Sequence, residues 1–269
     1  MQKKILITGS TDGIGLETAK MLVSKGHFVL LHGRNSEKLK KAKELILKDI
    51  GDGKIETYLA DLSRLNEVEQ LASNVSEHHD YLDVLINNAG ILMTPNTITE
   101  DGYDIRFVVN TFAPYLLTKK LLPRLNASSR VINLSSAAQS SVDLDALMGK
   151  KKLADMEAYA QSKLAITMWS KALAKSLQDT GPIFVAVNPG SLLGTKMVKE
   201  GFGMAGKDIQ IGAKILVRAA LSDEFSKSTG KYYDNDSQQF APPHRDVDNA
   251  QKVQSVVNNI ENMIVNLAP

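Results

Sequence analysis

The chain has 269 residues, of which 43% are hydrophobic and 23% charged, as in ordinary soluble globular proteins. The formal net charge of +2 gives no argument for nucleic-acid binding, and the absence of cysteine excludes disulfides, thiolate metal sites and a cysteine nucleophile. The first apolar run is too short for a signal peptide, and no stretch approaches the roughly 20 apolar residues of a membrane span. We therefore predict a cytoplasmic protein without a membrane anchor.

Short apolar runs alternate with amphipathic stretches along the whole chain. The predicted strands are 4–8, 27–32, 55–60, 84–89, 130–135, 183–188 and 231–234. The predicted helices are 14–25, 36–50, 64–78, 103–125, 156–179, 208–221 and 246–267. Apolar strands that alternate with helices indicate a parallel sheet covered on both faces. We predict one α/β domain over 1–269, a doubly wound, Rossmann-type parallel sheet of seven strands in the order 3-2-1-4-5-6-7.

Two long stretches, 136–155 and 190–207, lack clear periodicity. Loops of this length inside a compact domain are usually functional lids or insertions. We predict an insertion at 137–155 and a lid over the substrate at 192–208. The lid offers methionine, phenylalanine and glycine, which suit a mobile cover over an apolar carbonyl; a plain connector packed on the sheet is the alternative.

The segment "TGSTDGIG" (8–15) follows the first strand and opens the first helix. Its glycines, Gly9, Gly13 and Gly15, have the spacing G-x-x-x-G-x-G. Glycines let the backbone turn tightly and approach a pyrophosphate, which the positive end of the helix attracts. The pattern predicts a dinucleotide site, and a plain strand-to-helix turn is the alternative.

The second strand ends in "LLHGRN", with Arg34 and without a carboxylate. An acidic residue at this position would bind the 2′-hydroxyl of an adenosine ribose, whereas a guanidinium pairs with a 2′-phosphate. Arg34 therefore favours NADP(H), with NAD possible, and an arginine without a partner is the alternative. The negative charge of Asp12 in the glycine loop argues mildly against NADP. The lysines at 38, 40, 41 and 43 are interpreted as a solvated face, with a basic patch as the weaker reading.

Tyr159 and Lys163 in "YAQSK" are four positions apart and so share one face of a predicted helix. A carbonyl that accepts a hydride needs a proton, and tyrosine with a pKa near 10 is a poor donor or acceptor at neutral pH. A nearby ammonium, together with an oxidised nicotinamide, would lower that pKa. A serine of "NLSS" (133–136), at the carboxyl end of a strand, would stabilise the developing oxyanion.

In order and spacing, these motifs resemble the short-chain dehydrogenase/reductase family, and the likeness covers nearly all of the chain. The matching motifs are "TGSTDGIG" (8–15), "DL" (61–62), "NNAG" (87–90), "VN" (109–110), "NLSS" (133–136), "YAQSK" (159–163) and "NPG" (188–190). Each motif is short, but the set is highly specific.

The resemblance implies catalytic roles for four residues. Tyr159 would be the acid–base, and Lys163 would hold the nicotinamide ribose and tune Tyr159. Ser136 would bind the carbonyl, with Ser135 as the alternative. Asn110 would anchor a proton-relay water by distorting its helix, or would be only a structural kink.

The resemblance also implies a set of cofactor contacts. They would be made by Gly9, Ser10, Gly13, Ile14, Gly15, Arg34, Asn35, Asp61, Leu62, Asn88, Ala89, Gly90, Tyr159, Lys163, Pro189, Gly190 and Thr195. Asp61 would contact adenine, with a helix N-cap as the alternative. Thr195 lies one residue further from Pro189 than is usual in the family, which weakens its assignment.

The spacing from Ser136 to Tyr159 is about ten residues longer than in compact family members. This insertion, like "HGRN", is similar to the retinol-dehydrogenase-like and carbonyl-reducing branch, whose members tend to use NADP(H) and apolar carbonyls or alcohols. Family members usually form a homodimer or homotetramer through the helices predicted at 103–125 and 156–179.

We therefore predict an NADP(H)-dependent oxidoreductase that interconverts an apolar ketone or aldehyde and its alcohol. The main alternative is a non-catalytic regulator that senses NADP, although such proteins typically lose the tyrosine or the lysine. A sugar-nucleotide epimerase or dehydratase is less well supported, because only about 80 residues follow "NPG". No histidine has metal-ligand spacing, so no metal site is predicted.

Overall fold

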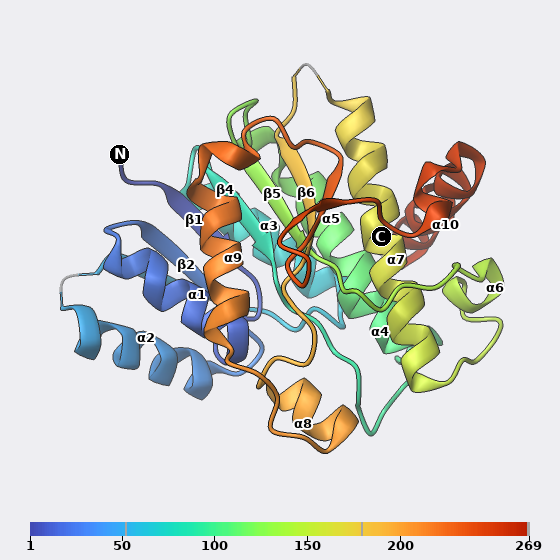
Figure 1. The fold of residues 1–269 in the computed structure, drawn as a ribbon, viewed down its shortest axis with the longest axis horizontal. Coiled ribbons are helices and arrows are strands. Elements are labelled where there is room, and N and C mark those ends of the chain that lie inside the picture. The colour runs from blue at the N-terminus through green and yellow to red at the C-terminus, as the bar shows by residue number, and fades with distance from the viewer. Residues whose placement is uncertain (52, 179, 268–269) are drawn as a thin grey trace.

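The computed structural model describes residues 1–51, 53–178 and 180–267, and it forms one eight-stranded sheet with helices on both faces (Figure 1). The strands are β1 (Lys4–Ile7), β2 (Phe28–Gly33), β3 (Ile55–Leu59), β4 (Val84–Asn87), β5 (Arg130–Leu134), β6 (Ile183–Asn188), β7 (Lys231–Asp234) and β8 (Gln239–Ala241). Their order is β3-β2-β1-β4-β5-β6-β7-β8, which confirms the predicted order of the first seven.

The prediction of seven strands missed β8 at the edge of the sheet. This strand pairs with β7 in the antiparallel direction, with Tyr232 opposite Ala241, whereas all other pairs are parallel. With only three residues, followed by two prolines, β8 carries no periodic signal of its own. The sheet is therefore mixed, with one antiparallel strand at the edge, which is common in doubly wound folds.

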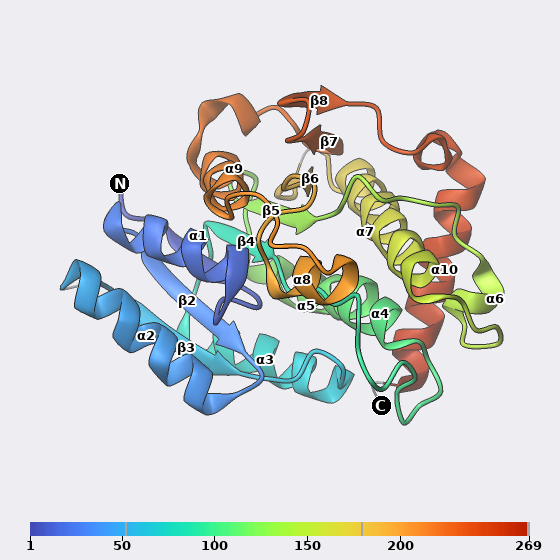
Figure 2. The same ribbon diagram turned by 60° about the horizontal axis from the view of Figure 1, so that its bottom comes forward.

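Two layers of helices cover the sheet. The helices α1 (Gly13–Ser24), α2 (Ser36–Ile50) and α9 (Gln210–Leu221) lie on one face. The helices α3 (Leu65–His78), α5 (Ala113–Leu121), α7 (Asp155–Ser176) and α10 (Ala250–Leu267) lie on the other, with α10 outside α7 (Figure 2). Strand side chains alternate between the layers: Ile5 and Ile7 face the first and Leu6 faces the second, all fully buried. Burial on both faces explains why the strands are continuous apolar runs.

The helix predicted at 103–125 is interrupted. It consists of α4 (Ile105–Phe107), a π-helical turn (Val108–Phe112), α5 and a 3₁₀ turn (Leu122–Arg124). Pro114 lacks an N–H, so the α-helical bond to the carbonyl of Asn110 four residues earlier cannot form. The wider π turn, with Ala113 N–H donating to Val108, takes up this break. Such turns often occur at functional sites.

Other predicted helices differ mainly at their ends. The helix predicted at 156–179 is α7, which ends at Ser176, and residue 179 lies outside the described part of the chain. The segment predicted as 246–267 begins with a 3₁₀ turn (Arg245–Asp248) before α10. Two short helices were missed, α6 (Leu144–Leu147) in the insertion and α8 (Lys196–Phe202) in the predicted lid.

The C-terminal helix α10 packs over α7 and also contacts α3 and α6 (Figure 2). The Tyr115 hydroxyl of α5 donates to Glu261 at 2.5 Å, and Tyr115 stacks edge-on against the buried Trp169 of α7. The helices predicted to form an interface between subunits are thus largely covered within the chain. A homodimer or homotetramer stays a prediction. Among the described helices, none combines the length and apolarity needed to span a bilayer.

Candidate active site

A cavity of about 660 Å³ opens at the carboxyl edge of the sheet, where open α/β sheets bind ligands. Most of the residues predicted to form the site line it: Gly9, Gly13, Ile14, Gly15, Arg34, Asp61, Leu62, Asn88, Ala89, Gly90, Ser136, Tyr159, Lys163, Pro189, Gly190 and Thr195. Ser10, Asn35 and Asn110 do not line it. The fold therefore gathers residues that are up to 186 positions apart in the sequence, from Gly9 to Thr195, around one space.

The glycine loop is packed so closely that two of its glycines have no room for a side chain. Gly9 has a φ of +64°, and a Cβ there would lie 2.9 Å from the Cα of Ala89. A Cβ on Gly15 would lie 2.4 Å from the carbonyl oxygen of Gly9. Asn88 holds the loop to β4, since its side chain donates to the carbonyl oxygens of Thr8 and Gly9 at 2.8 and 3.0 Å. The loop presents its backbone to the cavity at the start of α1, which fits a pyrophosphate.

His32, for which the sequence predicted no role, supports the same loop from β2. Its Nδ1 accepts a hydrogen bond from the Gly9 N–H at 3.2 Å, and its Nε2 lies 3.1 Å from the carbonyl oxygen of Ala60. The ring is therefore neutral with the proton on Nε2. Burial lowers the pKa of His32 to about 4, with the Ala60 carbonyl and Asp61 opposing this shift. Ser10 is buried beside it, and its hydroxyl bonds the backbone of His32 rather than facing the cavity.

The low pKa of His32 predicts how acid affects folding. Between pH 6.5 and about 4 the unfolded histidine binds a proton that the folded one does not, so the free energy of unfolding should fall across this window. A His32→Gln variant should show a smaller fall in urea unfolding between pH 7 and 4. The exposed His78→Gln serves as the control. An unchanged pH dependence in His32→Gln would show that His32 does not contribute this term.

Two cations lie where the second strand ends. Arg34 and Lys38 both line the cavity, and Asn35 caps α2 by accepting from the Lys38 N–H at 2.9 Å. The interpretation of Lys38 as part of a solvated face was therefore incomplete. Its place in the first turn of the helix that follows Arg34 is the sequence signal that would have indicated it.

The two acidic residues near this end of the cavity have local backbone roles. The Asp12 carboxylate is the N-cap of α1 and accepts from the Gly13 N–H at 2.7 Å. Asp61 accepts from the N–H and hydroxyl of Ser63 at 2.9 and 2.8 Å. The cap position of α3 is Arg64, so the alternative that Asp61 is the N-cap was wrong.

Ser136, Tyr159 and Lys163 converge on the other end of the cavity. Ser136 hydrogen-bonds the Tyr159 side chain, and the Nζ of Lys163 lies 5.7 Å from the centre of the Tyr159 ring. Lys163 is buried and donates to the Leu134 carbonyl at 2.7 Å. Ser135 also lines the cavity, but its hydroxyl is bonded to α7, at 3.0 Å from the Lys163 carbonyl and 2.7 Å from the Thr167 hydroxyl. The geometry thus favours Ser136 over Ser135 as the residue that faces a substrate.

The electrostatics of this group differ from the expectation that Lys163 lowers the pKa of Tyr159. Burial raises the pKa of Tyr159, and the hydrogen bond with Ser136 only partly opposes this shift. Burial also lowers the pKa of Lys163 to about 8. Tyr159 is therefore protonated at neutral pH in this structure.

A family model for short chain dehydrogenases matches residues 3–205, and this stretch contains the glycine loop, Ser136, Tyr159 and Lys163. The chain belongs to the short-chain dehydrogenase family. It is 32% identical to human retinol dehydrogenase 13 over 260 residues, which cover 90% of this chain and 78% of the relative. These findings support the retinol-dehydrogenase-like branch and an oxidoreductase that acts on CH–OH groups.

Solved structures agree with this assignment. An uncharacterised protein from Mycobacterium paratuberculosis has a TM-score of 0.80 and 27% identity, covering 97% of this chain and 93% of its own. A short-chain dehydrogenase from Escherichia coli CFT073, solved in complex with NADPH, has a TM-score of 0.70 and 28% identity, covering 87% and 96%. The family and the glycine loop support a nicotinamide cofactor.

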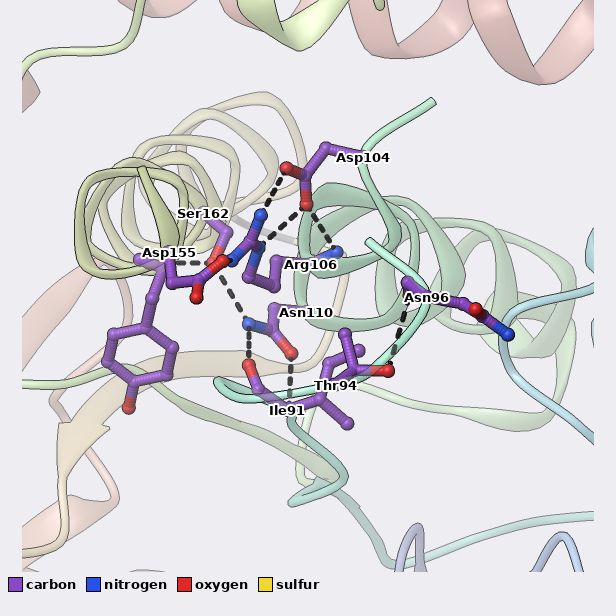
Figure 3. A network of polar contacts seen from close by, with 9 residues as sticks. Ile91, Thr94, Asn96, Asp104, Arg106, Asn110, Asp155 and Ser162 are labelled. Carbon is purple, nitrogen blue, oxygen red and sulfur yellow. Dashed lines mark hydrogen bonds and ion pairs between the residues drawn. The ribbon is translucent and has the colours of Figure 1, made fainter. Parts of the chain in front are cut away.

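In this short-chain dehydrogenase, Asn110 lies in the π turn and points toward Ile91 and Ser162 (Figure 3). Its side chain accepts from the Ile91 N–H at 2.8 Å and donates to the Ile91 carbonyl and the Ser162 hydroxyl, each at 3.0 Å. The helix is distorted at Asn110, but the break is explained by Pro114, and distortion by Asn110 itself stays a prediction. The Asn110 side chain thus joins the loop after β4 to α7. A proton-relay water held by Asn110 stays a prediction.

The loop 188–195 closes the cavity on the side of β6. Pro189, Gly190 and Thr195 line it as predicted, and Thr195 also caps α8 by accepting from the Val198 N–H at 3.2 Å. Figure 1 shows α8 beyond the edge of the sheet, apart from the helices that cover its faces. The predicted lid therefore contains a helix, and Met197, Val198 and Phe202 of this helix line the cavity. Within the described residues, no three His, Cys, Asp or Glu side chains are grouped as metal ligands would be.

Proposed function

We propose that this oxidoreductase uses NADP(H) to interconvert an apolar ketone or aldehyde and its alcohol, with Tyr159 as the acid–base. The observation that carries the proposal is the convergence of Ser136, Tyr159 and Lys163 on the cavity that the glycine loop opens. Retention of this group argues against a regulator that only senses NADP.

In the reductive direction, Ser136 donates a hydrogen bond to the substrate carbonyl and stabilises the negative charge that develops on its oxygen. The reduced nicotinamide, when bound, supplies the hydride that the carbonyl carbon accepts. Tyr159 donates its proton to the same oxygen and completes the alcohol. Its raised pKa keeps this proton in place at neutral pH until the substrate oxygen, which carries the developing charge, accepts it. Lys163, with its Nζ 5.7 Å from the centre of the Tyr159 ring, would hold the nicotinamide ribose.

The substrate end of the cavity supports an apolar carbonyl. Apolar side chains from three segments line it: Leu92 after β4, Met156 in α7, and Met197 and Phe202 in α8. Long methionine side chains adapt to varied apolar shapes. The human relative is named for retinol, an apolar alcohol, which is consistent with this class.

The preference for NADP(H) is attributed to Arg34 and Lys38 at the adenosine end. Arg34→Ala is expected to weaken NADPH binding by at least about tenfold, since a hydrogen bond to a charged group contributes roughly 1.5–3 kcal/mol. NADH binding should change far less, because NADH lacks the 2′-phosphate. Dissociation constants for both cofactors, measured by fluorescence titration, test this difference. Lys40→Ala is the control, because Lys40 lies on α2, just after Arg34, and does not line the cavity. Equal weakening of both cofactors would contradict the assignment.

The proposed activity is tested by following reduced-nicotinamide absorbance with NADPH and NADH across apolar aldehydes and ketones. We expect consumption with NADPH and little with NADH. NADPH binding without turnover of any carbonyl would instead favour the sensor hypothesis.

The segment 192–208 is proposed to move as a lid. Its base is tied by two backbone bonds of 2.7 Å each, from the Gly194 N–H to the Lys207 carbonyl and from the Lys207 N–H to the Leu192 carbonyl. Between these ties Phe202 and Met204 are about half exposed, at 47% and 46%. Hydrogen exchange should show added protection of 196–204 when cofactor and substrate bind. No added protection would mean that the segment is a fixed connector.

A further inference from the structure

The segment β7 and its following turn, 231–237 ("KYYDNDS"), does not line the cavity, yet it contacts two loops that do. One loop begins at Ser136 after β5, and the other is 188–191 at the end of β6. The sequence predicted only a strand at 231–234 here, and none of the family motifs includes a residue of this segment. Its side chains make hydrogen bonds to both of these loops.

The first contact is to the backbone of Ser136. The Tyr232 hydroxyl donates to the Ser136 carbonyl at 3.1 Å, and the Gln139 side chain donates to the same oxygen at 2.9 Å. Tyr232 lies on β7, two strands away from β5, and the small Ala186 of β6 stands between them in register. This small side chain leaves room for the tyrosine to reach across. Tyr232 is only 6% exposed, so its hydroxyl has little access to water as an alternative partner.

The second contact is to the loop 188–191. Asp236 accepts from the Ser191 N–H at 2.9 Å, from the Ser191 hydroxyl at 2.5 Å and from the Asn188 side chain at 2.9 Å. Asp234 accepts from the same Asn188 side chain at 2.7 Å, and Asn235 donates to the Pro189 carbonyl at 2.9 Å. Every residue of the turn 234–236 therefore bonds this loop.

The ionised state of Asp236 strengthens its hydrogen bonds to the loop 188–191. Burial raises the pKa of Asp236, but the hydrogen bonds from Ser191 and Asn188, with the positive charge of Lys207, outweigh it and hold the pKa below its usual value. Asp236 thus accepts its bonds as a carboxylate, and charged acceptors form stronger bonds than neutral ones.

We propose that the segment 231–237 is a positioning element that sets two active-site loops independently, Tyr232 placing Ser136 for the carbonyl and Asp236 placing 188–191 for the nicotinamide end of the cofactor. The inference rests on the proposed function. Precise placement matters because a shift of about 1 Å in a catalytic group costs on the order of 10²-fold in rate. The contact of Tyr232 (the first arm) and the contacts of Asp236 (the second arm) act on different loops. The first should therefore affect kcat, and the second the Kd of NADPH.

The first arm is tested with a pair of neighbouring tyrosines. Tyr232→Phe should lower kcat by about five- to tenfold, the size of one hydrogen bond, and leave the Kd of NADPH within twofold of wild type. Tyr233→Phe is the matched control: it removes a hydroxyl from the same strand, but that hydroxyl faces the opposite side of the sheet and accepts from Arg218 at 3.0 Å. Equal kcat values for the two variants, or a rise in the Kd of NADPH in Tyr232→Phe, would overturn this arm.

The second arm is tested by NADPH binding without substrate. Asp236→Ala should raise the Kd of NADPH by about tenfold or more, as measured by fluorescence titration. The conservative Asp236→Asn keeps an acceptor for the Ser191 N–H and should recover part of the affinity. Asp248→Ala, which removes a carboxylate paired with Lys171 on the surface, should bind as wild type does. Wild-type affinity in Asp236→Ala would overturn the arm.

These binding and kinetic readouts separate the inference from the proposed function. If the wild-type protein turns over no carbonyl, the proposed function fails while the Asp236 arm is still decided by NADPH binding. If the wild type is active but Tyr232→Phe and Tyr233→Phe do not differ, the positioning role fails and the function stands. Urea unfolding of each variant shows whether a loss of stability explains its effect.

Discussion

Tyr159→Phe is expected to lower kcat for carbonyl reduction by about 10²- to 10⁴-fold, the usual contribution of a positioned acid–base group. The phenyl ring keeps the shape of the cavity wall, so only the hydroxyl and its proton are lost. Because burial raises the pKa of Tyr159, its hydroxyl, which is hydrogen-bonded to Ser136, carries its proton at neutral pH. The Kd of NADPH should stay within a fewfold of wild type, which locates the defect in the chemical step.

The measurement is the rate of NADPH consumption at saturating cofactor with the best carbonyl found, together with a fluorescence titration of NADPH. Tyr81→Phe is a suitable control, since Tyr81 is 50% exposed, does not line the cavity and has its ring next to the Lys4 ammonium. Tyr81→Phe should retain wild-type kcat. Full turnover in Tyr159→Phe with normal cofactor binding would rule out the proton-transfer role of Tyr159.

Arg106→Met is expected to lower the free energy of unfolding by about 3–5 kcal/mol, a large part of the stability of a typical domain. Arg106 is 1% exposed and bonds Asp104 through Nε at 2.8 Å and Nη2 at 2.6 Å, and it also bonds Asp155 (Figure 3). Asp104 is only 7% exposed, so removal of the guanidinium leaves a buried carboxylate without its cation. That unpaired charge, rather than the lost packing, is the main cost.

Arg218→Met is the matched control. Arg218 makes a bidentate pair with Glu224 at 2.7 and 2.8 Å, with both side chains more than one third exposed, and it donates to the Tyr233 hydroxyl at 3.0 Å. No buried charge loses its partner, so a loss of only about 1–2 kcal/mol is expected. Urea unfolding at pH 7 measures both variants. Since Asp155 begins α7, four residues before Tyr159, Arg106→Met should also reduce activity below the unfolding transition. A loss of stability no larger than that of Arg218→Met would contradict the importance of the buried pair.

Local signals in the sequence determined much of the fold and of the cofactor site. Strands such as β1 and β5 are continuous apolar runs because both faces of the sheet are covered, and this pattern predicted seven of the eight strands and their order. The glycine loop was predictable because two requirements arise within it: Gly9 has a φ of +64°, and a Cβ on Gly15 would lie 2.4 Å from the Gly9 carbonyl oxygen. Tyr159 and Lys163 were predictable because helical spacing alone places them on one face.

Other features depend on contacts between distant segments, which no local pattern encodes. Adjacent Ser135 and Ser136 have the same chemistry, and only the packing of α7 against β5 brings the Ser135 hydroxyl to its partners on α7.

The sequence by itself therefore determined the family, the order of the parallel strands, the glycine loop and the pairing of Tyr159 with Lys163. Only the tertiary structure decided the hydrogen bonds of Ser135, the neutral state of His32, the ion pairs of Arg106 and the contacts of 231–237. The physical reason is the range of the interactions. Periodicity and turn chemistry act between near neighbours in the chain, whereas hydrogen bonds such as Tyr232 to Ser136 join residues 96 positions apart.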